Sequence, residues 1–163
     1  MNTFFIIHNS SKPGSHDLAK YVRDYLEERG GLCSCPTDTD RELPEEKNYL
    51  YTNPQWVPDF TDCVIVIGGD GTLLQAARDL REKNIPFIGI NGGTVGYLAE
   101  VNVESIEYAL DCLLNEEYTI EKRMMLTCKS QAEKITKKLE TLEKYIIISE
   151  TDTANVLIRT YPT

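Results

Sequence analysis

One aspartate in this sequence of 163 residues lies among glycines, directly after an apolar run. Residues 63–67 read Cys-Val-Ile-Val-Ile, and residues 68–72 read Gly-Gly-Asp-Gly-Thr. The apolar run is typical of a buried strand, and the glycines leave the backbone beside Asp70 with little side-chain cover. Strand, glycine turn and helix N-terminus form the geometry with which α/β proteins hold phosphate. A carboxylate repels phosphate unless a metal ion or an acceptor hydroxyl lies between them, so the pattern indicates phosphoryl transfer.

A second glycine-rich segment follows the next apolar run. Residues 87–90 read Phe-Ile-Gly-Ile, and residues 91–98 read Asn-Gly-Gly-Thr-Val-Gly-Tyr-Leu. Two successive strands therefore end in loops with few side chains, at the carboxyl edge of a parallel sheet, where open α/β sheets bind ligands. Two such loops, the first with an acid, are stronger evidence than one. On the residues alone, Asp70 as a turn aspartate that satisfies local N–H groups stays open as the alternative.

The segments around these loops predict a parallel α/β sheet. Residues 3–8 are expected to form a buried strand, and a helix that Ser15 caps is expected to end at residues 30–31, which are both glycine. Residues 32–35 predict a second short strand, which completes a βαβ unit with parallel strands. Thr72 is expected to cap a second helix that runs to about residue 83, and residues 103–114 predict a third.

Composition and charge argue against several classes of function. The formal net charge of −9 and the pI near 4.7 argue against nonspecific nucleic-acid binding. No apolar run approaches the roughly 20 residues of a membrane-spanning helix. The first residues lack the basic segment of a secretory signal. We therefore expect a cytoplasmic protein with neither a membrane nor a nucleic acid as partner.

The five cysteines are scattered and predict no disulfide framework. Cys63 and Cys112 are expected to be small core residues, because they lie on apolar faces of a strand and a helix. The Cys33-x-Cys35 pair does not have zinc-knuckle spacing, and His8 and His16 are not arranged to complete a metal site. We expect reduced cysteines and no metal ligands from the protein.

Two parts of the chain do not follow the α/β pattern. Residues 36–62 predict a long surface loop, whose aromatic residues Tyr49, Tyr51 and Trp56 are expected to pin it to the domain rather than to stack on a ligand. Residues 118–126 are expected to be extended. Beyond them, residues 145–148 and 156–158 predict short strands.

The motifs resemble those of a known family. Residues 68–72 resemble the signature of the superfamily that includes NAD kinases, diacylglycerol and sphingosine kinases and 6-phosphofructokinases. Residues 89–98 are similar to the NAD kinase pattern of glycine, hydrophobe and asparagine, followed by Gly-x-hydrophobe-Gly-aromatic-Leu. Lipid kinases of the superfamily tend to carry Pro-x-Gly-Thr-x-Asn-Asp there instead. Residues 123–126, Arg-Met-Met-Leu, resemble the strand that opens the second domain of NAD kinases.

This resemblance implies ATP-dependent phosphorylation of the 2′-hydroxyl of the adenosine ribose of NAD, which gives NADP. It implies that Asp70 orients or deprotonates that hydroxyl as the catalytic general base. ATP would be the phosphoryl donor, NAD the substrate, and a divalent metal such as Mg²⁺ would offset charge. A homo-oligomer is expected for the intact protein. The residues that the resemblance assigns to cofactor and substrate binding are Gly68, Gly69, Gly71, Thr72, Leu74, Asn91 and Tyr97.

The C-terminal residues depart from the family pattern. NAD kinases continue into a β-rich second domain with an Ala-Leu-Asn-Glu/Asp motif, and no such motif follows residue 126. We expect residues 1–122 to form a Rossmann-like α/β nucleotide-binding domain. Residues 123–163 are expected to form an incomplete or divergent start of the β-rich substrate domain. A lipid kinase of the same superfamily and a non-catalytic nucleotide-binding remnant remain as alternatives.

Overall fold

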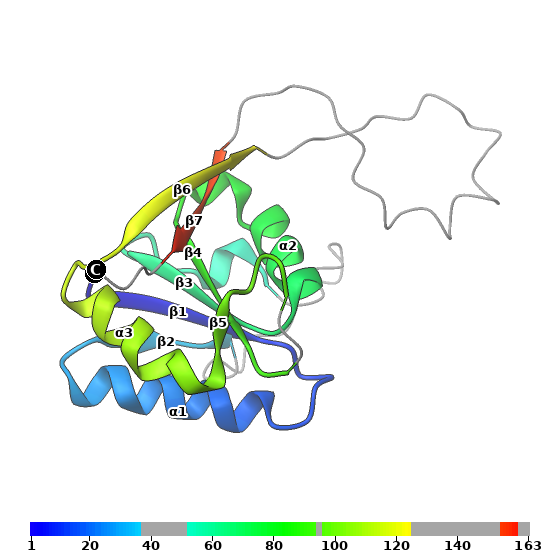
Figure 1. Ribbon diagram of the computed structural model, residues 1–163. Helices are drawn as coiled ribbons and strands as arrows, with labels where there is room; N and C mark the ends of the chain where they lie inside the picture. Colours follow the sequence, from blue (N-terminus) through cyan, green and yellow to red (C-terminus); the bar gives the residue numbers. More distant parts are fainter. Residues whose placement is uncertain (37–51, 94–95, 125–153, 160–163) are drawn as a thin grey trace, which may run out of the picture.

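The computed structural model describes residues 1–36, 52–93, 96–124 and 154–159 (Figure 1). Its centre is a sheet of parallel strands, in the order β2-β1-β3-β4, and β5 pairs with the carboxyl end of β4. This arrangement confirms the predicted parallel α/β sheet. The strands are β1 (Thr3–His8), β2 (Leu32–Ser34), β3 (Cys63–Ile67), β4 (Phe87–Asn91) and β5 (Val101–Asn102).

Two further strands join the same sheet beyond β4. Strands β6 (Thr119–Met124) and β7 (Ala154–Arg159) pair antiparallel along their whole length, and β7 meets β4 where Phe87 pairs with Leu157. Figure 1 shows this pair rising from the edge of the sheet. The extended segment predicted at 118–126 is confirmed for β6, and the strand predicted at 156–158 is confirmed within β7. Residues 145–148 lie outside the described residues.

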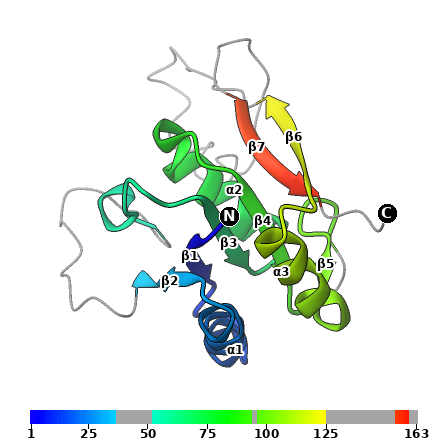
Figure 2. The same ribbon diagram turned by 90° about the vertical axis from the view of Figure 1, so that its left-hand side faces the viewer.

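Helices cover both faces of the sheet, as Figure 2 shows. Alternation along β1 sends Phe4 and Ile6 into the core with α1 (Ser15–Glu28) and α3 (Ile106–Leu114). The intervening residues of β1, Phe5 and Ile7, pack into the core with α2 (Asp70–Asp79) on the opposite face. Strands covered on both faces are apolar throughout, which explains why all five residues of β3 are buried.

Both predicted helix caps are wrong. The N-cap of α1 is Gly14, with φ of 78°, and the Ser15 hydroxyl donates instead to the carbonyl of Asn9 at 2.6 Å. Helix α2 begins at Asp70, three residues earlier than a Thr72 cap predicts, with Gly69 as its N-cap. Thr72 therefore lies inside the first turn, where its N–H already donates to the Gly69 carbonyl. A hydroxyl at that position packs against the loop rather than capping the helix.

The predicted extents of two other helical segments also differ. Helix α2 ends at Asp79. A separate 3-10 helix spans Arg81–Lys83, and its C-cap is Asn84, which has a φ of 51°. A 3-10 helix at Val103–Ser105 precedes α3, because the Asn102 side chain accepts the Ser105 N–H and tightens this turn. The predicted helical segments therefore exist, but each consists of an α-helix and a short 3-10 helix.

Several predictions about buried residues are confirmed. Cys63 and Cys112 are buried in the core. Trp56 packs against the α2-side core, so this aromatic residue does pin its segment to the domain. Tyr49 and Tyr51 lie outside the described residues. Among the residues that the structure describes, no helix has both the length and the apolar character needed to cross a bilayer.

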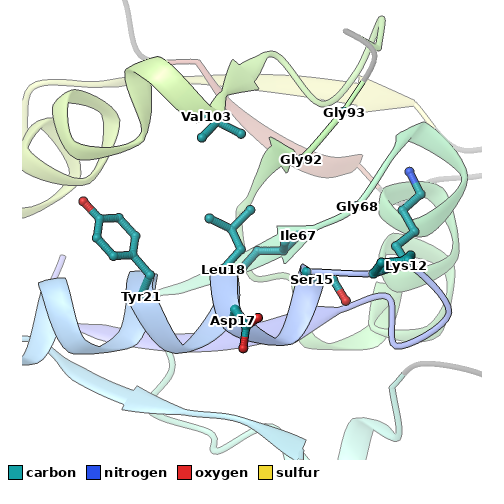
Figure 3. Close-up of a pocket in the computed structure, with 12 residues that line it drawn as sticks. Lys12, Ser15, Asp17, Leu18, Tyr21, Ile67, Gly68, Gly92, Gly93 and Val103 are labelled. Carbon is teal, nitrogen blue, oxygen red and sulfur yellow. The ribbon is translucent and has the colours of Figure 1, made fainter.

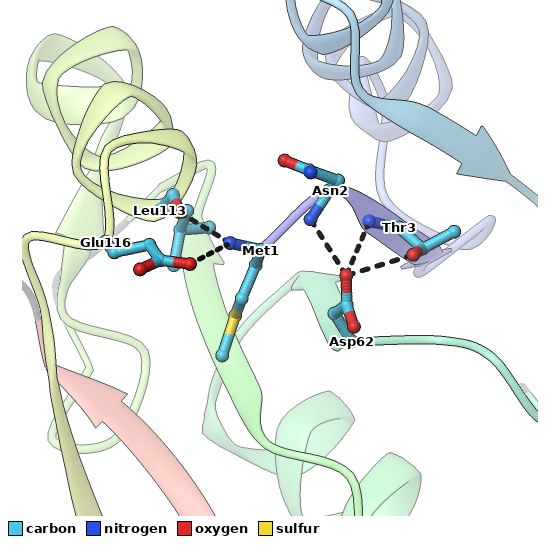
Figure 4. A network of polar contacts seen from close by, with 6 residues as sticks. All are labelled: Met1, Asn2, Thr3, Asp62, Leu113 and Glu116. Carbon is cyan, nitrogen blue, oxygen red and sulfur yellow. Dashed lines mark hydrogen bonds and ion pairs between the residues drawn. The ribbon is translucent and has the colours of Figure 1, made fainter.

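A carboxylate ties together the strand starts at the amino edge of the sheet (Figure 4). Asp62, the residue before β3, accepts three hydrogen bonds on its Oδ2 atom. The donors are the N–H of Asn2 at 2.8 Å, the N–H of Thr3 at 3.0 Å and the Thr3 hydroxyl at 2.9 Å. The start of β1 is thereby fixed beside the start of β3.

Candidate active site

The first glycine turn is fixed by close packing at the carboxyl end of β3. The Gly68 N–H donates to the Ile90 carbonyl of β4 at 2.9 Å. A Cβ atom on Gly68 would lie 2.6 Å from the Thr72 hydroxyl, so no side chain fits there. Thr72 itself is buried, and its hydroxyl lies 3.4 Å from the Asn9 side-chain amide. Gly68 and Thr72 therefore set the shape of the turn that presents Asp70.

The Asp70 carboxylate joins the first loop to the second. Its Oδ2 accepts the N–H of Tyr97 at 2.9 Å. Its Oδ1 accepts the N–H of Leu98 at 3.0 Å and the N–H of Ala99 at 3.1 Å. A Cβ atom on Gly96 would lie 2.2 Å from Asp70 Oδ1, so this glycine is required for the carboxylate to reach the loop. Neither a helix cap nor a local turn describes this aspartate, because its partners are 27 or more residues away.

These contacts set the charge of Asp70. Partial burial acts to raise the pKa of this carboxyl, but the N–H bonds from residues 97–99 outweigh burial and hold the pKa below its ordinary value. Asp70 is therefore ionised at neutral pH. A carboxylate offers about four acceptor positions, and three are occupied. The arrangement can orient one further donor, such as a hydroxyl, with little freedom of rotation.

The other residues singled out from the sequence occupy different positions around Asp70. Leu74 lies one turn along α2 and is 39% exposed, and the Tyr97 side chain is 78% exposed beside the Asp70 contact. Gly71 has open space where a Cβ would stand. Asn91 is buried, and its side-chain oxygen accepts the N–H of Gly93 at 3.1 Å, so it shapes the second loop. The structure brings Asp70 and Tyr97 together, whereas the Asn91 side chain faces its own loop.

Sequence reasoning assigned no site role to two residues at this edge. Gly96 lies within the second glycine motif, and only the contact with Asp70 explains why it must be glycine. Lys12 lies in the polar turn after β1, with its Nζ atom 3.4 Å from the position of a Cβ on Gly69. Both could have been found by applying the carboxyl-edge rule to every strand of the predicted sheet, β1 included.

The described residues form no cluster of metal ligands. No three side chains of the histidine, cysteine, aspartate or glutamate type come together among them in a group that could hold a metal ion. Cys33, Cys35, His8 and His16 are among the described residues. The rings of His8 and His16 meet edge to face, with their centroids 5.6 Å apart. Burial, and to a smaller extent the charge of His16, lowers the pKa of His8.

Fold and site together define a class of protein. The chain is an open parallel α/β protein that presents two glycine loops and an oriented carboxylate at the ligand-binding edge of its sheet. The family model described as ATP-NAD kinase N-terminal domain matches residues 4–118. The chain therefore belongs to the NAD kinase family.

Curated relatives agree with this assignment. The chain is similar to the NAD kinase of Lachnospira eligens, with 41% identity over 126 residues, and to that of Lachnoclostridium phytofermentans, with 36% identity over the same length. Each alignment covers 77% of this chain and 42% of the relative. The NAD kinase of Agathobacter rectalis is 33% identical over 126 residues, which are 43% of its length. The chain thus spans less than half the length of the curated relatives it matches.

Proposed function

We propose that the protein to which this chain belongs is an NAD kinase, which transfers the terminal phosphoryl group of ATP to the 2′-hydroxyl of the adenosine ribose of NAD. Membership of the family supports this activity. The observation that carries the proposal is the Asp70 carboxylate, held by three backbone N–H groups between the two glycine loops. A kinase of this kind needs such a fixed acceptor, because phosphoryl transfer depends mainly on positioning and charge.

In the proposed reaction the 2′-oxygen of the ribose forms a bond to the γ-phosphorus of ATP. The bond between that phosphorus and the oxygen it shares with the β-phosphate breaks, and ADP leaves. Asp70 accepts a hydrogen bond from the 2′-hydroxyl and aims its oxygen at the phosphorus. Because the pKa of Asp70 is lowered, this carboxylate is a weak base, and it takes the proton only as the new P–O bond forms.

The roles of the remaining site residues are proposed from their burial and from the free space around them. We propose that Gly69 and Gly71 let phosphate approach the backbone, while Gly68 and Thr72 hold the turn in shape. The exposed side chains of Leu74 and Tyr97, close to Asp70, are proposed to contact NAD, and Asn91 to shape the second loop. Sequence reasoning assigned all seven to binding. Four of them are not buried, which supports direct contact with a ligand: Gly69, Gly71, Leu74 and Tyr97. Gly68, Thr72 and Asn91 are buried, which supports an indirect role in shaping the loops.

A divalent metal fits this site only as part of the nucleotide. Mg²⁺ is usually held by one or two carboxylates together with substrate phosphates. The described residues offer no protein metal cluster, and Asp70 already accepts three hydrogen bonds. We therefore propose that Mg²⁺ arrives on the ATP phosphates and supplies charge neutralisation there.

The wider organisation is proposed from the family resemblance. Residues 1–122 are proposed to form the nucleotide-binding domain and residues 123–163 to begin or replace the β-rich substrate domain. We propose a cytoplasmic homo-oligomer for the intact protein. The 163 residues alone are expected to form little NADP, because the relatives are more than twice as long as the matched segment.

The test is NADP formation by the protein produced from its complete gene. NAD, ATP and Mg²⁺ are incubated with the protein, and NADP and ADP are quantified by chromatography. We expect the two products in equal amounts. Formation of ADP with diacylglycerol but not with NAD as acceptor would establish a lipid kinase. Nucleotide binding without turnover would establish a non-catalytic remnant.

A further inference from the structure

Asn9 follows β1 directly and lies at the same sheet edge as the glycine turn of residues 68–72. Its backbone N–H donates to the carbonyl of Ile67, the last residue of β3, at 3.1 Å. Its side-chain Nδ2 donates to the Thr72 hydroxyl at 3.4 Å. Asn9 therefore contacts the residue just before the turn and the residue that ends it. Asp70 lies between these two contacts.

The Asn9 side chain is oriented by its own loop. Its Oδ1 accepts the N–H of Ser11 at 3.0 Å, which leaves the Nδ2 on the side of Thr72. The Asn9 carbonyl accepts the N–H of Lys12 at 2.9 Å and the Ser15 hydroxyl at 2.6 Å. The backbone N–H, the backbone carbonyl and both polar atoms of the side chain thus all have protein partners. Asn9 joins the loop after β1 and the start of α1 to the glycine turn.

The position of Asn9 does not suit a residue that binds a ligand. A cavity of about 430 Å³ borders the same loop, and Figure 3 shows Lys12, Ser15 and Gly68 among the residues that line it. Asn9 does not line this cavity. Because both polar atoms of its side chain face the protein, we expect Asn9 to influence a reaction only through the residues it holds.

Thr72 connects Asn9 to the shape of the turn. Thr72 is buried, and its hydroxyl would lie 2.6 Å from a Cβ on Gly68, so the hydroxyl packs against the first residue of the turn. The Thr72 N–H donates to the Gly69 carbonyl at 3.0 Å. With both ends of the turn in contact, a displacement of the Thr72 hydroxyl also displaces the residues between, Asp70 included.

We propose that Asn9 is a positioning residue for Asp70, because it holds Ile67 and Thr72 at the two ends of the turn that presents the carboxylate. This inference rests on the proposed function and adds a residue from the loop after β1 to that site. Asp70 has to accept three N–H groups of residues 97–99 and orient a hydroxyl at the same time. A misplacement of about 1 Å can reduce a reaction rate about 100-fold, so small shifts of the turn matter.

Amide hydrogen exchange tests this positioning without any substrate, in the protein produced from its complete gene. The N–H groups of residues 97–99 report on Asp70, because they donate to its carboxylate. The Val64 N–H, which donates to the Pro86 carbonyl within the sheet, reports on the stability of the whole domain. Asn9→Ala is expected to speed exchange at residues 97–99 about tenfold more than at Val64. Equal acceleration at the two places would overturn the inference.

Asn53→Ala is the matched control. The Asn53 Oδ1 accepts the N–H of Gln55 at 3.0 Å, the same two-residue contact at the same distance as in the Asn9 loop. Asn53 makes this contact at the start of a separate 3-10 helix. We expect Asn53→Ala to speed exchange at residues 97–99 no more than at Val64. A selective effect at residues 97–99 in this variant would overturn a role specific to Asn9.

Two variants of Thr72 test the route of the effect. Thr72→Val removes the hydroxyl that Asn9 contacts, and we expect it to speed exchange at residues 97–99 as Asn9→Ala does. Thr72→Ser keeps the hydroxyl and is expected to stay within about threefold of wild type, relative to Val64. Adding Thr72→Val to Asn9→Ala should change exchange less than about twofold further, because both remove one contact. Additive effects, or no effect of Thr72→Val, would overturn the inference.

Kinetics distinguish positioning from binding in an active protein. Asn9→Ala is expected to lower kcat for NADP formation about tenfold and to leave the KM for NAD within about twofold. A raised KM with unchanged kcat would overturn the inference. Selective exchange at residues 97–99 in Asn9→Ala, in a protein that forms no NADP, would support the positioning of Asp70 and overturn the proposed activity. NADP formation with unchanged exchange and unchanged kcat in Asn9→Ala would do the reverse.

Discussion

An aspartate lies just before β3 and another follows the glycine turn after it, and each accepts three hydrogen bonds. Asp62, at the amino edge, uses Oδ2 alone and accepts hydrogen bonds from Asn2 and from Thr3, the first residue of β1. Asp70, at the carboxyl edge, uses both oxygens and binds the backbone of residues 97–99. The first joins two strands of the sheet, and the second joins two loops. The number of hydrogen bonds therefore does not distinguish a structural carboxylate from one at a site.

Position along the strand separates the two. The start of β1 lies beside the start of β3, as Figure 4 shows. The partners of Asp62 are Thr3, the first residue of β1, and Asn2, the residue before it. The carboxyl edge of a parallel sheet ends in loops, which leave room for a ligand beside Asp70. The comparison predicts that equal changes to Asp62 and Asp70 have unequal effects.

The largest expected effect is on catalysis. Asp70→Asn removes the negative charge that orients the acceptor hydroxyl, and we expect it to lower kcat for NADP formation about 100-fold or more. Asp62→Asn is the matched control, since it alters a carboxylate with the same number of hydrogen bonds, away from the site. We expect its kcat to stay within about twofold of wild type. Equal losses of kcat in the two variants would mean that Asp70 acts only through the fold.

The next effect tests the contact that Asp70 makes. Gly96→Ala puts a Cβ 2.2 Å from Asp70 Oδ1, so the carboxylate must leave its position. We expect a loss of about 1–3 kcal/mol in the free energy of unfolding, measured by urea denaturation. Gly71→Ala is the control for stability, because its Cβ meets nothing within 4 Å and alanine favours a helix. A Gly96→Ala protein as stable as wild type would contradict the contact.

The Asp70 contact also marks the limit of sequence-based prediction. The apolar runs of β3 and β4 and the glycines after them predicted the strands, the parallel sheet and the edge at which Asp70 lies. They did not predict its partners, because the bond to the Tyr97 N–H joins residues that only the tertiary fold brings together. The error in capping has the same cause. Thr72 has the right residue type for a cap, but its hydroxyl lies 3.4 Å from the Asn9 side-chain amide, which only the tertiary fold brings near.

A smaller difference is expected in stability between the two asparagine variants. Asparagine has one acceptor oxygen, which can replace Asp62 Oδ2 but cannot replace both oxygens of Asp70. Asp70→Asn leaves one N–H of residues 97–99 facing an amide donor, and we expect it to cost about 1–2 kcal/mol. Asp62→Asn is expected to cost less than about 1 kcal/mol. Urea denaturation of both proteins measures the difference, and a greater loss for Asp62→Asn would reverse the comparison.

The smallest expected effect is the dependence of stability on pH. It follows from the pKa values of Asp62 and Asp70 and from that of a third aspartate, Asp79 of α2. The N–H of Asn2 and the other donors lower the pKa of Asp62, and Asp70 is likewise lowered. Burial raises the pKa of Asp79 above its ordinary value, which the Arg78 guanidinium offsets only in part.

For a lowered pKa, the contribution to stability is complete above the pKa of the unfolded chain, about 3.9, and disappears as pH falls through the folded value. For the raised pKa of Asp79 the sign is opposite, so ionisation destabilises the fold at neutral pH, and protonation relieves that cost as pH falls. Side-chain ¹³C titration should therefore give midpoints below 3.9 for Asp62 and Asp70 and above it for Asp79. Asp70→Asn should remove only the contribution of Asp70 to the loss of stability in acid. The amide chemical shifts of residues 97–99 should then no longer titrate below pH 3.9. If they still titrate there in that variant, the lowered pKa belongs to another group.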